Sequence, residues 1–180
     1  MTMPITTNPV LQRYEQLRRR PLGKVLFSWL LCRRAPYFRT IRPRILDLQP
    51  GRCMVAMSKR RRAVYNHLHT IHALTIGNLC ELAAGLMMEV TVPPALRWLP
   101  KGMTIDYLCK AETDLVATGE LPPNFPFQAA TEVPVTVRVH DRQGKEVARA
   151  VIRMWLSARQ EIQSISPAHP EADSTRRVPV

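Results

Sequence analysis

The feature that most constrains this chain is a nearly continuous apolar stretch from residue 73 to residue 90. Alanine and leucine are frequent in it, proline is absent, and Pro93-Pro94 follows soon after its end. This length and composition predict an α-helix, and apolar residues on nearly every side indicate that it is buried almost all round. The fold must therefore cover this helix from several directions.

Alternating patterns before and after this helix predict strands. Residues 45–48 and 53–57 flank a Pro50-Gly51 turn and predict two antiparallel strands. Residues 102–111 and 114–121 also alternate, and two longer alternating runs surround a turn at residues 141–144. The predicted class is α+β, with an antiparallel sheet curled around one long central helix. The side of the helix left open would be closed by a second copy or by an N-terminal helix.

One extra helix is predicted at the N-terminus, over residues 11–35. Its apolar centre, GKVLFSWLLCRR, follows three arginines and ends in two more. Two interpretations remain open: the helix packs on the domain, or residues 22–34 make a peripheral membrane contact in which Phe27 and Trp29 enter the interface. We expect an N-terminal helical extension over residues 1–40, a single domain over 41–160 and a flexible tail over 161–180.

The charge of the chain narrows the choice of partners. The net charge is +12, and arginine dominates the basic residues, so the surface attracts anions. Nucleic acid is not an expected partner, because aromatic residues do not interleave with the basic ones and no nucleic-acid-binding motif occurs. The four scattered cysteines indicate reduced thiols and a cytoplasmic location. No stretch approaches 18 continuous apolar residues, so we expect no membrane span.

Within residues 66–85 one carboxylate, Glu81, lies in the middle of the apolar run. Gly77, Ala84 and Gly85 share its face of the helix, and such small residues would leave a slot beside the carboxylate. A carboxylate in an apolar interior is costly unless it is paired or does chemistry. Both readings remain open: Glu81 is catalytic, or it fixes the register of an interface through hydrogen bonds.

The spacing of Asn66, His72, Ala73 and Glu81 resembles the signature of hotdog-fold acyl-CoA thioesterases of the phenylacetate type. In that pattern an Asn or Gln precedes His-Gly-Gly, and an acid follows nine residues after the histidine. The alternating runs at residues 103–121 and 135–156 also resemble the strands of this family. The resemblance covers about residues 42–158 and points to the branch defined only as a domain of unknown function. It implies the hotdog fold in at least a homodimer, or a dimer of dimers.

The resemblance also implies roles for these residues in thioester hydrolysis. Glu81 would act as general base or nucleophile, and the amide of Ala73 would stabilise the oxyanion at the start of the helix. His72 would orient the thioester or the loop, and Asn66 would bind the water or the carbonyl. Nine helical residues place His72 and Glu81 on opposite faces, so the acid would meet the histidine loop of the partner subunit.

The expected substrate is acyl-CoA or an acyl-carrier thioester. Gly77 and Gly85 would border the substrate, and the basic run at the end of the second strand would contact the phosphates of coenzyme A. That run could equally be a solvated strand end; it consists of Lys59, Arg60, Arg61 and Arg62. Three histidines lie close together, but no second cluster supports them, so we expect no metal site and no cofactor.

This sequence departs from the family pattern at the helix start. The two glycines that follow the histidine in the family are Ala73 and Leu74 here, and Leu74 would narrow the approach to the Ala73 amide. The leading hypothesis is an acyl-CoA thioesterase. The alternative is a catalytically silent hotdog module that binds acyl groups or lipids.

Overall fold

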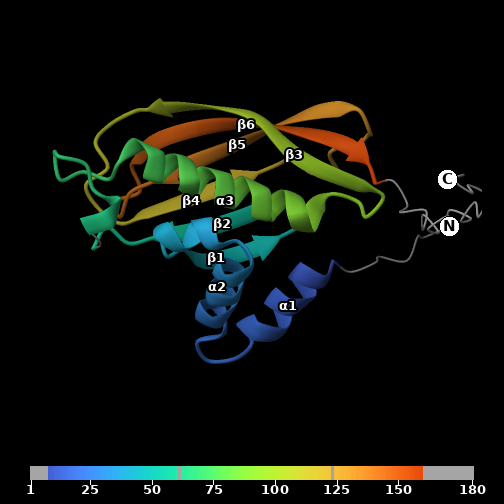
Figure 1. The fold of residues 1–180 in the computed structure, drawn as a ribbon, viewed down its shortest axis with the longest axis horizontal. Helices are drawn as coiled ribbons and strands as arrows, with labels where there is room; N and C mark the ends of the chain where they lie inside the picture. Colours follow the sequence, from blue (N-terminus) through green and yellow to red (C-terminus); the bar gives the residue numbers. More distant parts are fainter. Residues whose placement is uncertain (1–7, 61, 123, 160–180) are drawn as a thin grey trace, which may run out of the picture.

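A long helix, α3 (Ala73–Thr91), lies across one face of an antiparallel sheet (Figure 1). In this computed structural model the description covers residues 8–60, 62–122 and 124–159, so the predicted tail lies outside the described residues. Within them the sheet has six strands in the order β1-β2-β4-β5-β6-β3. The strands are β1 (Arg44–Gln49), β2 (Arg52–Met57), β3 (Leu96–Tyr107), β4 (Leu115–Glu120), β5 (Thr131–His140) and β6 (Glu146–Ala158). This arrangement confirms the predicted α+β class.

The two predicted hairpins are confirmed. Gly51 joins β1 to β2 with φ of 79°, and Gly144 lies in the turn between β5 and β6 with φ of 80°. Glycine adopts these left-handed angles without the steric cost of a side chain. The strand predicted to begin at Gly102 begins earlier, at Leu96, and its register with β6 shifts between Pro100 and Gly102. Pro100 has no N–H to donate, which suits an edge strand.

The sheet-facing side of α3 is wholly apolar. Ile76, Leu79, Leu82, Ala83 and Leu86 are all buried, as the sequence predicted. By length and composition alone α3 could cross a membrane, but 67% of its apolar window is buried inside this fold, as in the core helix of a globular domain.

Helix α3 approaches the sheet most closely over Gly119 of β4. A Cβ atom at Gly119 would lie 3.2 Å from the carbonyl carbon and oxygen of Ala83. Two small residues therefore face each other where the helix backbone rests on the sheet. Any larger side chain at Gly119 would have to displace backbone atoms, which cannot rotate away.

The N-terminal region differs from the prediction of one helix. Two helices, α1 (Pro9–Arg18) and α2 (Gly23–Arg34), form a hairpin, and a short 3-10 helix η1 (Pro36–Thr40) follows. The chain turns at Pro21 and Leu22, and Leu22 has φ of 59°. A Cβ atom at Gly23 would lie 1.7 Å from the carbonyl oxygen of Leu17, so the turn needs glycine there. Pro21 and Gly23 mark this break in the sequence itself, and the prediction of one continuous helix overlooked them.

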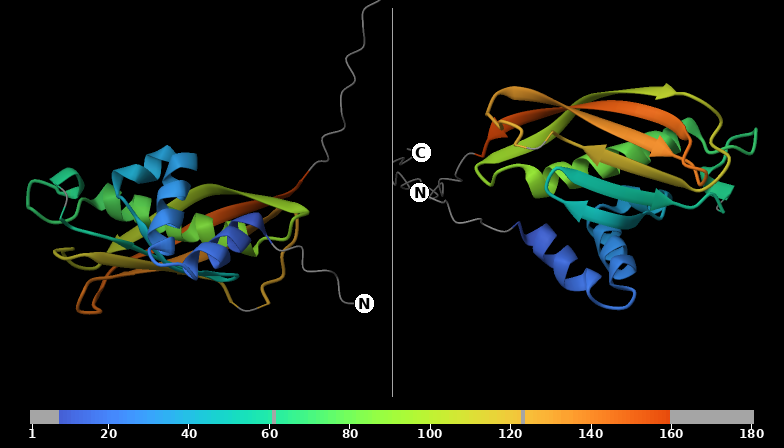
Figure 2. Two further views of the ribbon diagram at one scale, coloured as in Figure 1. Left: turned by 90° about the horizontal axis from the view of Figure 1, so that it is seen from below. Right: turned by 180° about the vertical axis from the view of Figure 1, so that it is seen from behind.

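The hairpin is fastened to the β1 edge of the sheet (Figure 2). Tyr14 of α1 is fully buried and packs edge-on against Phe27 of α2, with ring centroids 5.1 Å apart. The Ser28 hydroxyl accepts a hydrogen bond from the backbone N–H of Ile45 at 2.9 Å. This contact uses a donor of the edge strand β1 that would otherwise be open to pairing.

The loop after β2 is tied to the start of β4 by Asp114. Its carboxylate accepts hydrogen bonds from the Lys59 backbone N–H at 2.8 Å and from the Ser58 hydroxyl at 3.0 Å. The Lys59 N–H, helped by Ser58, holds the pKa of Asp114 below its ordinary value, although partial burial opposes this shift. Asp114 therefore fixes the base of the loop that carries the basic run.

We expect Gly119→Val to lower the free energy of unfolding by about 1 to 3 kcal/mol, because the added methyl groups overlap the α3 backbone. Denaturant unfolding measures this change. Thr118→Val is the matched control, since Thr118 is a half-buried neighbour in the same strand. Equal stability of the two variants would contradict the close packing of α3 on β4.

We expect Asp114→Ala to be less stable than the wild type near pH 7. Because the pKa of Asp114 is lowered in the folded state, its carboxylate stabilises the fold above the unfolded pKa of about 3.8. That contribution disappears as the pH falls through the lower folded-state pKa. Urea midpoints across this range should converge for the two proteins, whereas Asp106→Ala, at an exposed site, should change little at any pH. A difference in urea midpoint between Asp114→Ala and the wild type that persists at the lowest pH would refute this role of Asp114.

Candidate functional site

The loop before α3 is held by the side chain of Asn66. Its amide oxygen accepts hydrogen bonds from the backbone N–H groups of Leu68 at 3.0 Å and Thr70 at 3.1 Å. Its amide nitrogen donates to the Thr70 hydroxyl at 2.8 Å. Asn66 was expected to bind water or the substrate carbonyl, but the structure commits its amide to the loop. The residue therefore positions the chain that leads to His72.

His72 is the N-cap of α3 and its side chain is used for capping. The Nδ1 atom accepts a hydrogen bond from the Leu74 backbone N–H at 3.1 Å. Because Nδ1 is an acceptor, the ring proton lies on Nε2, which is directed away from the cap. The His72 backbone N–H donates to the carbonyl of Val64 at 2.8 Å, which anchors the start of the helix.

One backbone N–H in the first turn of α3 is available to bind a ligand. The N–H of Leu74 is capped by His72, and those of Thr75 and Ile76 both donate to the His72 carbonyl. The Ala73 N–H has no acceptor among the described residues. It lies at the positive end of the helix dipole, where an anion is stabilised. This geometry suits the oxyanion role that the resemblance implied.

Tyr107, at the end of β3, also contacts this first turn. Its hydroxyl donates a hydrogen bond to the carbonyl of Ala73 at 3.2 Å. Burial raises the pKa of Tyr107, and Cys80 contributes to the shift, so the hydroxyl remains a donor at neutral pH. No local sequence pattern marks Tyr107, because the contact depends on how β3 crosses α3.

Glu81 is half-buried, not enclosed as the apolar helix suggested. It lines a groove with a volume of about 560 Å³ between the N-terminal hairpin, α3 and β3. We call this the Glu81 groove. Its other lining residues are mostly apolar and include Leu31, Phe38, Leu82, Leu86, Trp98, Leu99 and Met154, together with Arg34, Gly85 and Glu89.

The two carboxylates of the groove differ in their partners. The indole N–H of Trp98 donates to Glu89 at 3.3 Å. Glu81 has no hydrogen-bond or ion-pair partner in the part of the chain that the structure describes. A carboxylate held without a partner beside apolar side chains is available for chemistry on a ligand in the groove.

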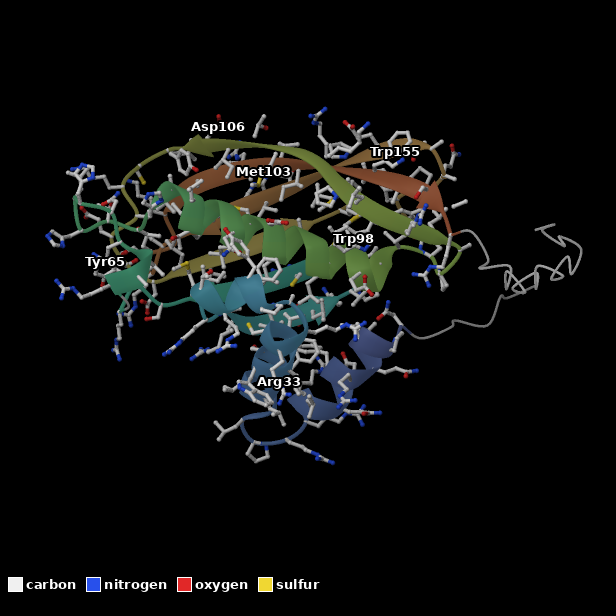
Figure 3. All side chains as sticks on the ribbon, viewed as in Figure 1. Arg33, Tyr65, Trp98, Met103, Asp106 and Trp155 are labelled. Atoms are coloured by element: carbon white, nitrogen blue, oxygen red, sulfur yellow. The ribbon has the colours of Figure 1, made fainter. Side chains whose placement is uncertain are left out.

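Two of the small residues beside Glu81, Gly77 and Gly85, contact side chains of β3. Two of these β3 residues, Trp98 and Met103, are labelled in Figure 3. A Cβ atom at Gly77 would lie 3.3 Å from Ile105 and 3.6 Å from Met103, and one at Gly85 would lie 3.1 Å from the Trp98 ring. Gly77 therefore lets β3 side chains approach the helix, so the expected slot is filled there. Gly85 still lines the Glu81 groove, beneath Trp98.

The basic run lies at the same end of the domain as the start of α3. Its last residue, Arg62, begins the 3-10 helix η2 (Arg62–Val64), and Val64 is hydrogen-bonded to His72. Arg60 and Arg62 are exposed, and the Lys59 ammonium lies 5.6 Å from the centroid of the Tyr65 ring. Arg61 lies outside the described residues. Arg60 and Arg62 thus face solvent in the segment that leads to the start of α3.

The candidate residues form two separate groups. Asn66, His72, Ala73 and the basic run gather at the start of α3, whereas Glu81 lies eight residues along the helix, roughly 12 Å further on. One ester carbonyl cannot touch both the Ala73 amide and Glu81 of the same chain at this separation. The described residues hold no group of three His, Cys, Asp or Glu side chains suited to a metal ion.

Comparison with known proteins identifies the family. The sequence profile of the family described as domain of unknown function (DUF4442) matches residues 23–156. No curated protein matches the chain. A crystal structure of a genomics target is 36% identical, with a TM-score of 0.73, and the alignment covers 83% of this chain and 99% of that one.

Two further crystal structures share the fold at lower identity. A Pseudomonas aeruginosa protein of unknown function, described as a probable thioesterase, is 19% identical with a TM-score of 0.67, covering 78% of this chain and 97% of that chain. A thioesterase family protein from Silicibacter pomeroyi is 22% identical with a TM-score of 0.62, covering 81% and 99%. The chain therefore belongs to the DUF4442 family and has the hotdog fold that its sequence resembles.

Proposed function

We propose that this protein is an acyl-CoA thioesterase in which Glu81 is the catalytic carboxylate. The observation that carries the proposal is the state of Glu81: half-buried, unpartnered among the described residues, and set in an apolar groove. The likeness to proteins named as thioesterases supports the same reaction class. An acyl chain would lie along the apolar lining, with its thioester carbonyl at Glu81.

The chemistry follows from the acceptor that Glu81 provides. Its carboxylate takes a proton from water while the water oxygen attacks the thioester carbonyl carbon. The resulting tetrahedral oxyanion collapses, the carbon–sulfur bond breaks, and the departing thiolate takes the proton back. An acid and a thiol are the products. The oxyanion needs a donor, and the Ala73 amide is the free backbone donor at the helix start.

We propose that this donor comes from a second copy of the chain. The roughly 12 Å along α3 between Ala73 and Glu81 is too long for one chain to supply both groups to one carbonyl. Strand β3 is a 12-residue edge strand, paired on one side with β6 among the described residues. Pairing of β3 with β3 of a second copy would satisfy its open edge and bring the two helices together.

The basic run would hold the coenzyme A end of the substrate. Lys59, Arg60 and Arg62 lie near the start of α3, beside the proposed oxyanion donor. Guanidinium groups bind phosphate by charge-assisted hydrogen bonds. The substrate would then run from the basic run of one subunit to the Glu81 groove of the other.

A silent acyl-binding module is the second candidate, and the position of Leu74 favours it. Leu74 is 75% exposed and follows directly after the Ala73 amide. In this alternative the Glu81 groove binds an acyl group, but the carbonyl does not reach the amide. Absence of turnover with tight acyl-CoA binding would establish that function.

We expect Glu81→Gln to lower kcat by roughly 10²- to 10⁴-fold, because the amide cannot accept the proton. Thiol release from acyl-CoAs of increasing chain length measures this loss. Glu89→Gln is the matched control, since Glu89 lies on the same helix and in the same groove but is paired with Trp98. Similar activity of Glu81→Gln and Glu89→Gln would remove Glu81 from the mechanism.

We expect Ala73→Pro to lower kcat by roughly 10²-fold or more while leaving stability nearly unchanged. Ala73 is the first helical residue, where proline is well tolerated, and His72 already has extended backbone angles that suit a following proline. The substitution therefore removes the backbone N–H donor of residue 73 and should leave the rest of the helix start unchanged.

Mixing the two inactive variants tests whether the site is shared. A heterodimer of Glu81→Gln and Ala73→Pro contains one intact site if the groups come from different subunits. Random mixing should then restore about a quarter of the wild-type activity. No recovery after confirmed subunit exchange would show that each site belongs to one chain.

A further inference from the structure

Helix α2 carries an exposed apolar stripe that the proposed function does not use. Leu22, at the tip of the hairpin, is 81% exposed, and Trp29 is 53% exposed; Val25 and Leu26 are exposed between them. These positions are spaced i, i+3, i+4 and i+7 and therefore share one face of the helix. We call this surface the α2 stripe. A patch of contiguous large apolar side chains marks an interaction surface.

The side of α2 that packs on the domain explains why the stripe is left outside. Phe27 is buried and packs on Tyr14 of α1, and Ser28 is buried and hydrogen-bonded to the edge strand β1. The helix cannot turn its stripe inward without breaking these contacts. In both Figure 1 and Figure 2 the turn between α1 and α2 projects away from the sheet, at the side opposite β3. The stripe is thus a fixed feature of the folded hairpin.

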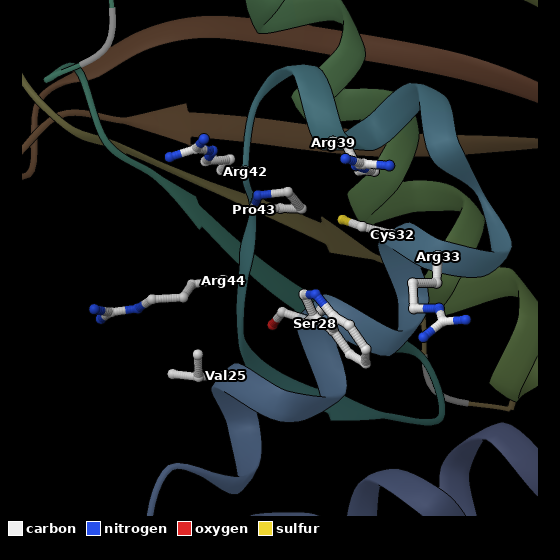
Figure 4. Close-up of a pocket in the computed structure, with 9 residues that line it drawn as sticks. Val25, Ser28, Cys32, Arg33, Arg39, Arg42, Pro43 and Arg44 are labelled. Atoms are coloured by element: carbon white, nitrogen blue, oxygen red, sulfur yellow. The ribbon is translucent and has the colours of Figure 1, made fainter.

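A basic hollow lies directly beside the α2 stripe (Figure 4). It has a volume of about 730 Å³ and shares Val25 and Trp29 with the stripe. The Arg33 guanidinium lies over the Trp29 ring, 5.0 Å from its centroid. The hollow is rimmed by four arginines, each exposed: Arg33, Arg39, Arg42 and Arg44.

Basic side chains dominate this region, although Asp114 and Asp141 line a neighbouring hollow together with Arg42 and Arg44. Between Glu15 and Asp47 the sequence has nine basic residues and no Asp or Glu. A second copy of the same surface would bring these like charges together, which opposes self-association through this face. A nucleic acid would match the charge but would leave the α2 stripe without an apolar partner. A bilayer with anionic lipids offers both phosphates and acyl chains.

We infer that the α1–α2 hairpin docks on the surface of membranes that contain anionic phospholipids. Leu22 and Trp29 enter the boundary between head groups and acyl chains, and the arginines of the basic hollow bind lipid phosphates. Trp29 suits this position because its ring is apolar and its N–H is polar. The inference is independent of catalysis by Glu81, although α2 also contributes Leu31 and Arg34 to the Glu81 groove.

Vesicle co-sedimentation of the full chain tests this inference. We compare phosphatidylcholine vesicles with vesicles that also contain phosphatidylglycerol, at an ionic strength of roughly 0.1 M. We expect at least about ten-fold stronger binding to the anionic vesicles, weakening as salt is added. Equal binding to both vesicles, or no binding to either, would overturn the inference.

Two sets of variants separate the apolar and charged contributions. Leu22→Ser with Trp29→Ser should weaken binding by roughly ten-fold or more. Arg33→Gln, Arg39→Gln and Arg42→Gln together should weaken it on the order of 100-fold, since each arginine contributes about five-fold. All of these side chains are exposed, so we expect each variant to unfold at nearly the same temperature as the wild type.

A control changes one leucine and one arginine elsewhere. Leu108→Ser with Arg138→Gln changes an exposed leucine and an exposed arginine of the β-sheet region, and vesicle binding should stay within about two-fold of the wild type. A loss of about five-fold or more from the single arginine of the control, equal to the loss per arginine in the hairpin, would mean that binding follows net charge and not this surface. Unchanged vesicle binding in both sets of hairpin variants, or a shift only in oligomeric state, would also contradict the inference.

Discussion

The structure depends on the need to cover one helix that is apolar on nearly every side. The sheet covers the face of α3 that carries Leu79 and Ala83, and Gly119 allows the closest approach. Strand β3 covers the face with Gly77 and Gly85. The N-terminal hairpin approaches a third side but leaves the Glu81 groove between itself and β3. The position of the candidate carboxylate thus follows from incomplete cover of the helix.

The same helix supplies the second half of the proposed chemistry at its other end. In the first turn of α3, His72 accepts hydrogen bonds from the backbone N–H groups of Leu74, Thr75 and Ile76, and only the Ala73 N–H is left without an acceptor among the described residues. Asn66 fixes the loop that positions His72. Among the described residues neither the Ala73 N–H nor the Glu81 carboxylate has a partner, and both are consequences of how one helix is capped and covered. Their separation along the helix is the reason that a second copy enters the proposed site.

Much of the fold could be predicted because its signals are local. The turns at Gly51 and Gly144 and the apolar run of α3 need no tertiary information. The break at Leu22 was missed although Pro21 and Gly23 mark it locally, and the structure shows that Gly23 is required by its contact with Leu17. By contrast, the partners of Tyr107 and Trp98 depend on the path of β3 across α3. Long-range packing, and not local propensity, decides these two contacts.

A crystal structure with a non-hydrolysable acyl-CoA thioether analogue tests the shared site most directly. We expect the acyl chain to fill the Glu81 groove of one subunit. We also expect the position of the thioester carbonyl to lie within hydrogen-bond reach of Glu81 in that subunit and of the Ala73 N–H in its partner. An analogue bound away from Glu81, or contacted by both groups of a single chain, would show that the proposed shared site is wrong.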